Sequence, residues 1–170
     1  MLHPDYQYDP KLIPQIIDKF KNGASVVFAS RMTKGCEAIK KGMPVYKYVF
    51  NRILTKFQNL VLKKNLSEYH TGYRAFRSDV LRMIKYNNFS NDFIFDNQII
   101  IEIFEKGFTI DEIYCPAKYE NTSSSINFIR SIKYGFGVAF TAKYSLNPLF
   151  HENASFNALA FSRIPFSSYK

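Results

Sequence analysis

The sequence predicts an α/β fold with a mostly parallel sheet. Two kinds of segment follow one another along the chain. Some have apolar residues at helical spacing, and others are short and either apolar throughout or alternately apolar and polar, as strands are. The length of 170 residues suits one domain, and 46% hydrophobic residues are enough for a substantial core. No window contains the roughly 18 uninterrupted apolar residues that a spanning helix needs.

The first part of the chain predicts two helices around one buried strand. Asp9, followed by proline, is a typical helix start, and Gly23 is a typical stop after an apolar stripe with helical spacing. Residues 25–29 are β-branched or apolar and predict a buried strand. Residues 30–42, rich in lysine and glycine, predict a loop, and the pattern of residues 44–62 is helical again.

The middle of the chain predicts further short elements. A polar, irregular stretch over residues 65–74 leads into an extended pair at residues 75–76. Ser78 or Asp79 is expected to cap a helix that ends near residue 85. A loop is expected over residues 87–92.

The last elements are another helix, a strand and a further helical stretch. Residues 93–106 predict a helix that Gly107 ends, and residues 108–114 alternate as a strand does. Residues 123–144 are helical in pattern, and the apolar and basic side chains of residues 126–144 predict contact with the sheet or with an anionic membrane surface. We expect one domain over residues 1–144 and a loosely attached tail over residues 145–170.

The charge is strongly basic, with 23 Lys and Arg against 14 Asp and Glu, a net of +9. Such a surplus suits nucleic acid, an anionic membrane or a phosphorylated substrate. The basic residues are dispersed, with no run of five or more, so we expect no nucleic-acid partner. The two cysteines make neither a disulfide framework nor a zinc cluster, and no signal peptide is present, so a reducing, cytoplasmic location is expected.

Two polar blocks suggest ligand contacts in the first part of the chain. His3, Asp5 and Gln7 alternate and would face the same way in an extended segment, where Asp5 suits a hard divalent ion; the alternative is an ordinary turn. Arg31 follows the predicted strand, at the end where open α/β sheets bind ligands, and its forked donors suit a diphosphate. The alternative for Arg31 is a surface position in a loop.

Two further blocks lie later in the chain. The heptapeptide EYHTGYR combines an acid, an imidazole and a guanidinium around Gly72, which allows close approach of a ligand; the alternative is a structural turn. Its candidate substrate-binding residues are Glu68, His70, Gly72 and Arg74. Asp96 lies near a helix start, where it would serve either as a general base or as a capping residue.

Taken together, these blocks resemble the family 2 glycosyltransferases with the A-type fold, especially the polyprenyl- and dolichyl-phosphate sugar synthases. The segments HPDYQYDP, ASR, EYHTGYRAF, FIFDNQ and SSSINF occur in that order across residues 3–128. The resemblance implies a three-layer α/β/α nucleotide-diphospho-sugar transferase fold. It also implies transfer of a hexose from a UDP- or GDP-sugar to a lipid-phosphate or glycan acceptor, with inversion.

The resemblance also assigns roles to individual residues. Asp5 matches the second Asp of the family's metal-binding Asp-x-Asp motif, with His3 at the first position and Gln7 at an assisting one, so Mg or Mn is implied. Arg31 matches an arginine that contacts the sugar or phosphates, and Glu68 an acidic position before the Gly–aromatic–Arg block. Asp96 matches the catalytic base.

The family's first half, which binds the nucleotide base, has no counterpart before the metal motif of this chain. We therefore expect the C-terminal portion of the fold only, a weak catalyst on its own, and a tendency to self-associate through an exposed sheet edge. A non-catalytic remnant or binding module of the same fold is the alternative. The expected location is cytoplasmic, at the inner face of a membrane.

Overall fold

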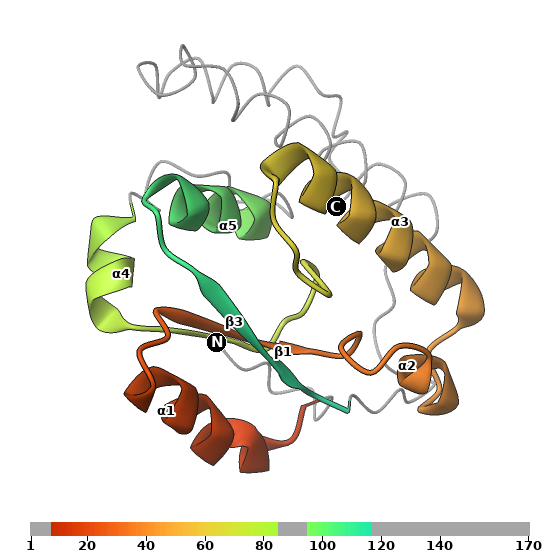
Figure 1. The fold of residues 1–170 in the computed structure, drawn as a ribbon. Helices are drawn as coiled ribbons and strands as arrows, with labels where there is room; N and C mark the ends of the chain where they lie inside the picture. Colours follow the sequence, from red (N-terminus) through yellow and green to blue (C-terminus); the bar gives the residue numbers. More distant parts are fainter. Residues whose placement is uncertain (1–7, 85–94, 117–170) are drawn as a thin grey trace, which may run out of the picture.

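The computed structural model describes residues 8–84 and 95–116, and these form three layers (Figure 1). A three-stranded sheet lies between helix α1 on one side and helices α3, α4 and α5 on the other. The elements in chain order are η1 (Pro10–Leu12), α1 (Ile13–Lys21), β1 (Val26–Ser30), α2 (Glu37–Lys40), α3 (Val45–Leu62), β2 (Arg74–Phe76), α4 (Ser78–Met83), α5 (Phe95–Glu105) and β3 (Ile110–Tyr114).

The sheet has the order β2–β1–β3, with β1 in the centre. Strands β1 and β3 are parallel, and Val26 pairs with Ile110. Strand β2 is antiparallel to β1, with Phe28 opposite Arg74. The expectation of a mostly parallel sheet is therefore wrong for the β1–β2 pair. The chain enters β2 beside the carboxyl end of β1 and runs back along it, without the crossover that a parallel pair requires.

Strand β1 is buried on both faces because successive side chains point to opposite sides. Val27 and Ala29 pack with the apolar residues of α1, whereas Val26 and Phe28 pack with those of α4 and α5. This double burial explains why the sequence of β1 is continuously apolar rather than alternating. It also confirms that helices cover both faces of the sheet.

Most predicted elements are present with small shifts at their ends. Asp9 caps η1 by accepting a bond from the Lys11 amide at 2.9 Å, and Gly23 follows α1 with a φ of +94°. Gly107 ends α5 with a φ of +78°, a backbone conformation that disfavours residues with a Cβ.

Three predictions need correction. The expected loop over residues 30–42 contains the short helix α2. Helix α4 begins with Arg77 at its N-cap, and neither Ser78 nor Asp79 caps it, because both lie inside the helix. The strand predicted over residues 108–114 begins at Ile110, since the backbone of residues 107–108 closes α5.

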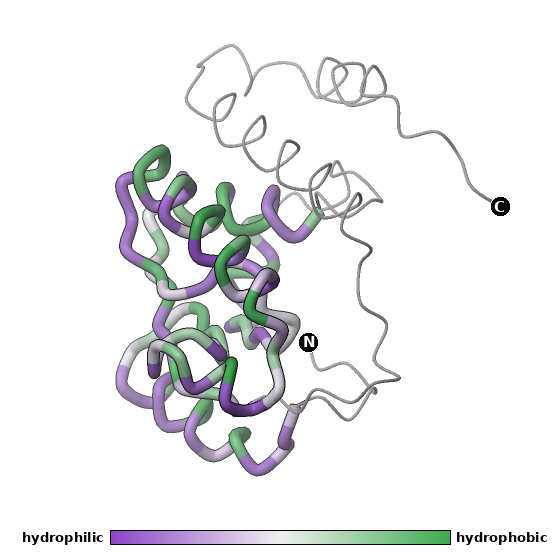
Figure 2. Tube along the Cα trace, turned by 90° about the vertical axis from the view of Figure 1, so that its right-hand side faces the viewer, coloured by the Kyte–Doolittle hydropathy of each residue, from purple (hydrophilic) through white to green (hydrophobic). Residues whose placement is uncertain are grey.

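The helical stretch predicted over residues 123–144, the tail from residue 145 and the loop over residues 87–92 lie outside the described residues. Within the described part, no helix is both long and apolar enough to cross a membrane. Coloured by hydropathy, the trace alternates between apolar and polar residues along the helical turns (Figure 2).

Candidate functional site

The polar residues of the candidate site gather where β1 and β3 end. The two strands are parallel, so their carboxyl ends lie at the same edge, and the Cys115 amide donates to the Ser30 carbonyl at 2.9 Å. The loop before β2 returns to this edge, where the Ala29 amide donates to the Tyr73 carbonyl at 2.9 Å. The carboxyl edge of an open α/β sheet is the usual place for a ligand.

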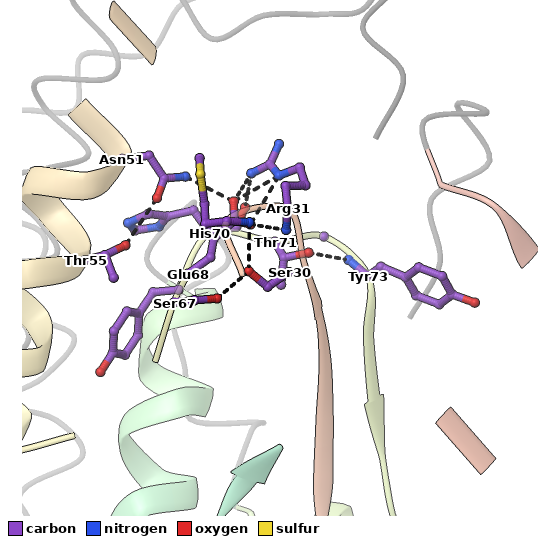
Figure 3. A network of polar contacts seen from close by, with 12 residues as sticks. Ser30, Arg31, Asn51, Thr55, Ser67, Glu68, His70, Thr71 and Tyr73 are labelled. Carbon is purple, nitrogen blue, oxygen red and sulfur yellow. Dashed lines mark hydrogen bonds and ion pairs between the residues drawn. The ribbon is translucent and has the colours of Figure 1, made fainter. Parts of the chain in front are cut away.

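Arg31 and Glu68 form the central ion pair of this edge (Figure 3). The Arg31 amide donates to one carboxylate oxygen of Glu68 at 2.9 Å, and Nε donates to the other, also at 2.9 Å. Nη2 of Arg31 donates to Glu68 and, at 3.2 Å, to the His70 carbonyl. Glu68 is fully buried and the Arg31 side chain is 13% exposed, so the pair lies at the boundary between core and solvent.

Helix α3 extends the hydrogen-bond network of this pair with two polar side chains. Asn51 donates to Oε1 of Glu68 at 3.0 Å, and Thr55 donates to the Asn51 amide oxygen at 3.2 Å. Burial alone would raise the pKa of Glu68, but the Arg31 guanidinium and its hydrogen bonds outweigh burial, and the pKa is lowered. Glu68 is therefore a buried carboxylate kept ionised by its partners.

A second carboxylate fixes the loop that carries Glu68. Glu112 of β3 accepts bonds from the Ser67 amide at 2.8 Å and from the Ser67 hydroxyl at 2.7 Å. The Ser67 and Ser30 hydroxyls are 2.6 Å apart. Burial raises the pKa of Glu112, and the bonds from Ser67 counter that shift only in part. The loop is thus held to both strands at the edge.

The segment after Glu68 packs closely against the sheet. The Thr71 hydroxyl donates to the Ala29 carbonyl at 2.6 Å, and the Gly72 amide donates to the Tyr8 hydroxyl at 3.1 Å. His70 is half-buried, and desolvation, with Arg74 and Arg31 acting in the same direction and Glu68 against it, lowers the pKa of its imidazole to about 4. His70 is therefore neutral at physiological pH.

Arg74 connects the loop to helix α5. Nε of Arg74 donates to the Thr71 carbonyl at 2.8 Å, and Nη2 donates to the Tyr69 carbonyl at 3.0 Å. Nη1 lies 3.0 Å from Oδ1 of Asp96, which stands in the first turn of α5. The Arg74 side chain is 2% exposed and that of Asp96 is 39% exposed, so a buried cation orients a solvent-accessible carboxylate.

The structure thus brings five predicted residues into two linked groups. Arg31, Glu68 and the His70 carbonyl form one group, and Arg74 and Asp96 form the other. Gln58 of α3 donates to Asn97, the neighbour of Asp96, at 3.0 Å. One face of helix α3 therefore bonds to Glu68 of the first group and to the residue beside Asp96 of the second.

The metal ligands expected from the sequence, His3, Asp5 and Gln7, lie outside the described residues. Within residues 8–84 and 95–116, no three His, Cys, Asp or Glu side chains are grouped so that they could hold a metal ion. Gly72, the remaining candidate, contributes its amide to Tyr8, the first residue that the structure describes. This bond holds Tyr8 beside the candidate site.

Several residues of the site were not predicted from the sequence: Ser30, Asn51, Thr55, Gln58, Ser67 and Glu112. Three of them could have been recognised from their spacing. Asn51, Thr55 and Gln58 are four and three residues apart and so share one helix face. A polar stripe in a helix otherwise rich in apolar residues indicates buried polar contacts when the stripe faces the protein. The roles of Ser67 and Glu112 depend on contacts across 45 residues of sequence, which no local pattern predicts.

Comparisons with known proteins find distant relatives. The chain is 25% identical over 109 residues to a protein of Pyrococcus furiosus named dolichol-phosphate mannosyltransferase. The alignment covers 63% of this chain and 29% of the archaeal protein, so the chain spans well under half of that relative. No family model and no solved structure matches. The similarity suggests the general class of glycosyltransferases.

Proposed function

We propose that the chain belongs to an inverting glycosyltransferase that transfers a hexose from a UDP- or GDP-sugar to a lipid-phosphate or glycan acceptor. The observation that carries the proposal is the meeting of three separate sequence blocks at one sheet edge. Two arginine–carboxylate pairs, Arg31–Glu68 and Arg74–Asp96, join these blocks across 37 and 22 residues of sequence. The distant relative named as a mannosyltransferase supports the same class of reaction.

In this proposal Asp96 is the general base. An acceptor oxygen attacks the anomeric carbon of the donor sugar, the bond from that carbon to the diphosphate breaks, and the acceptor proton passes to Asp96. Partial exposure gives the carboxylate access to an acceptor, and the bond from Arg74 restricts its orientation. Both features are what a positioned base requires.

Arg31 is the proposed contact with the sugar or diphosphate, and Glu68 is its positioning residue. Glu68 binds the amide and the guanidinium of Arg31 together, so both the backbone and the side chain are oriented at the end of β1. His70, the other proposed contact with the diphosphate, is neutral at physiological pH. Its imidazole would therefore contribute a hydrogen bond and no charge. A guanidinium that is already ordered loses less conformational entropy when it binds a ligand.

The proposed metal, Mg or Mn, would be held by Asp5 with help from His3 and Gln7, and it would neutralise charge on the leaving diphosphate. Tyr8, which follows Asp5 by three residues in the sequence, accepts a bond from the Gly72 amide of the candidate site at 3.1 Å.

The alternative function is a binding module that retains the fold without the chemistry. It is favoured by the way in which Arg31 and Glu68 satisfy each other inside the protein, as a structural pair would. A binding module would bind nucleotide sugars without turning them over.

The test is a transfer and hydrolysis assay of the 170-residue chain with UDP- and GDP-sugars, Mn²⁺ and a polyprenyl phosphate. Arg31→Lys is the informative variant, because lysine keeps the charge but loses the forked donors. We expect it to weaken donor binding, measured by titration calorimetry. Arg77→Lys, at an exposed arginine paired with Asp79, is the matched control and should leave binding unchanged. Donor binding that Arg31→Lys leaves unchanged would refute the proposed contact, and binding without turnover would favour the binding module.

A further inference from the structure

Helix α3 has an unusual orientation, because its apolar face points outward. On the side that faces the protein it buries one apolar residue, Leu54, and three polar ones, Asn51, Thr55 and Gln58. On the other side it exposes six large hydrophobic side chains, with exposed fractions from 38% at Phe57 to 78% at Leu60. The six residues are Val45, Tyr46, Val49, Ile53, Phe57 and Leu60.

The exposed residues form one continuous stripe. They follow one another at spacings of one, three or four residues, which places them on one side of a helix with 3.6 residues per turn. An 18-residue helix is about 27 Å long, so the stripe runs along most of that length. An amphipathic helix normally turns its apolar stripe toward the core, so this stripe is expected to have a partner.

The orientation of the helix is set by its polar contacts. Asn51 is bound to Glu68, and Gln58 is bound to Asn97, so rotation of α3 about its axis would break both bonds. The loss of these two buried hydrogen bonds would be costly. The apolar stripe therefore faces away from the candidate site in every arrangement that keeps these bonds.

The charged residues of the segment that carries the stripe are all of one sign. Between Met43 and Ser67 the chain has no aspartate or glutamate, and it has five basic residues: Lys47, Arg52, Lys56, Lys63 and Lys64. Lys56 is exposed beside the stripe, and Lys63 and Lys64 are exposed at its end. An apolar stripe bordered by cations complements a surface that is apolar inside and anionic at its boundary.

We propose that α3 lies in the plane of an anionic lipid surface, with its apolar stripe in the bilayer and its lysines at the lipid headgroups. A second copy of the chain fits the stripe less well, because it would bring two sets of basic residues together without counter-charges, and lysine is depleted in protein interfaces. The proposal involves a different face from the candidate site and does not require catalysis.

The arrangement has a consequence for the candidate site. The buried face of α3 bonds to Glu68 and to Asn97, while the opposite face would contact lipid. A helix with its side chains is about 10–12 Å across, so the site would be held roughly one helix diameter from the headgroups. An acceptor anchored in the same membrane would meet the site at a fixed height.

The test uses the absence of tryptophan from the sequence. Ile53→Trp places a single fluorophore in the stripe, and Ile17→Trp places one at a similarly exposed position of α1, on the opposite side of the sheet. Each protein is mixed with vesicles of phosphatidylcholine alone and with vesicles that also contain phosphatidylglycerol. We expect a blue shift of the emission only for Ile53→Trp, and only with phosphatidylglycerol. No shift, or equal shifts for both variants, would overturn the proposal.

Two other outcomes identify another occupant of the stripe and also overturn the proposal. Emission of Ile53→Trp that shifts to the blue with protein concentration, without vesicles, would indicate a second copy. Emission that is blue in dilute protein and unchanged by vesicles would indicate that another segment of the chain covers the stripe. Neither measurement needs a sugar donor, so failure here is distinct from failure of the proposed transfer reaction.

A pair of charge-reversal substitutions tests the membrane proposal a second time and leaves every apolar residue unchanged. Lys56→Glu with Lys63→Glu should reduce co-sedimentation with phosphatidylglycerol vesicles by at least about tenfold, because each basic residue near such a surface contributes to binding. Lys11→Glu with Lys21→Glu, at two exposed lysines before and at the end of α1, gives the same net charge and is the matched control. Equal losses in both pairs would show a general charge effect and no docking through α3.

Discussion

Arg74 and Asp96 are joined by an ion pair of 3.0 Å between Nη1 and Oδ1, in which the arginine is buried and the aspartate is partly exposed. The pair connects the start of β2 to the first turn of α5. Because Arg74 also donates to two carbonyls of the preceding loop, the position of Asp96 depends on that loop. Arg74 thus links the proposed base to the proposed donor-binding segment through an ion pair and hydrogen bonds.

Asp96→Asn should lower turnover by roughly 10²- to 10⁴-fold with donor binding largely retained, since an amide cannot accept the acceptor proton. Steady-state kinetics and donor titration give the two quantities. Asp111→Asn is the matched control, because Asp111 is also partly exposed and paired with a cation, Lys19, at 3.2 Å. Equal losses of turnover and donor binding in Asp96→Asn would assign Asp96 a structural or ligand-binding role.

Glu68→Ala should destabilise the fold by about 3 kcal/mol or more, because it removes the buried partner of Arg31 and of Asn51. Urea unfolding followed by circular dichroism measures the change. Asp79→Ala, which breaks the exposed pair between Arg77 and Asp79, is the comparison and should have little effect. A small effect of Glu68→Ala would mean that solvent or a neighbouring acceptor replaces the carboxylate.

Asp5→Asn should abolish the activity that depends on Mn²⁺ or Mg²⁺, because the resemblance gives Asp5 the position of the main anionic ligand. Activity and calorimetric Mn²⁺ binding are measured in the same preparation. Asp9→Asn is the control, since Asp9 caps η1 through the Lys11 amide and should affect stability rather than metal binding. Unchanged metal dependence of Asp5→Asn would remove this assignment.

Local patterns predicted the elements of this fold better than their arrangement. The strand at β1 and the helices α1, α3 and α5 follow from apolar spacing and from the stops at Gly23 and Gly107. The antiparallel pairing of β2 did not follow, because a three-residue strand carries no information about its direction.

The orientation of α3 shows the same limit in the candidate site. Apolar spacing predicts the helix and, by the usual rule, an inward apolar face. The structure has the polar face inward, because Asn51 and Gln58 bond to residues 17 and 39 positions away. Arg31, Glu68, Arg74 and Asp96 could be selected from the sequence as candidates, but their pairing required the tertiary structure.

Acid should destabilise the fold through His70. Burial lowers the pKa of this imidazole from its ordinary value of 6.5 to about 4, so the unfolded chain binds the proton more readily than the folded chain. The contribution of His70 to the free energy of unfolding is therefore present above pH 6.5 and is lost as the pH decreases toward 4. The loss is about 3 kcal/mol over that range, at 1.36 kcal/mol per pH unit. Urea unfolding at pH 7 and pH 5 measures most of this effect, above the range in which Glu68 titrates.

His70→Asn is the variant that isolates this contribution to the pH dependence. Asparagine has no proton to gain in this range, so the difference in stability between pH 7 and pH 5 should shrink by about 2 kcal/mol relative to the original chain. The comparison is made between slopes against pH, and a uniform loss of stability from the substitution therefore cancels. An unchanged slope would mean that His70 is protonated in the folded protein above pH 5, and its imidazole would then be available as a cation beside Glu68.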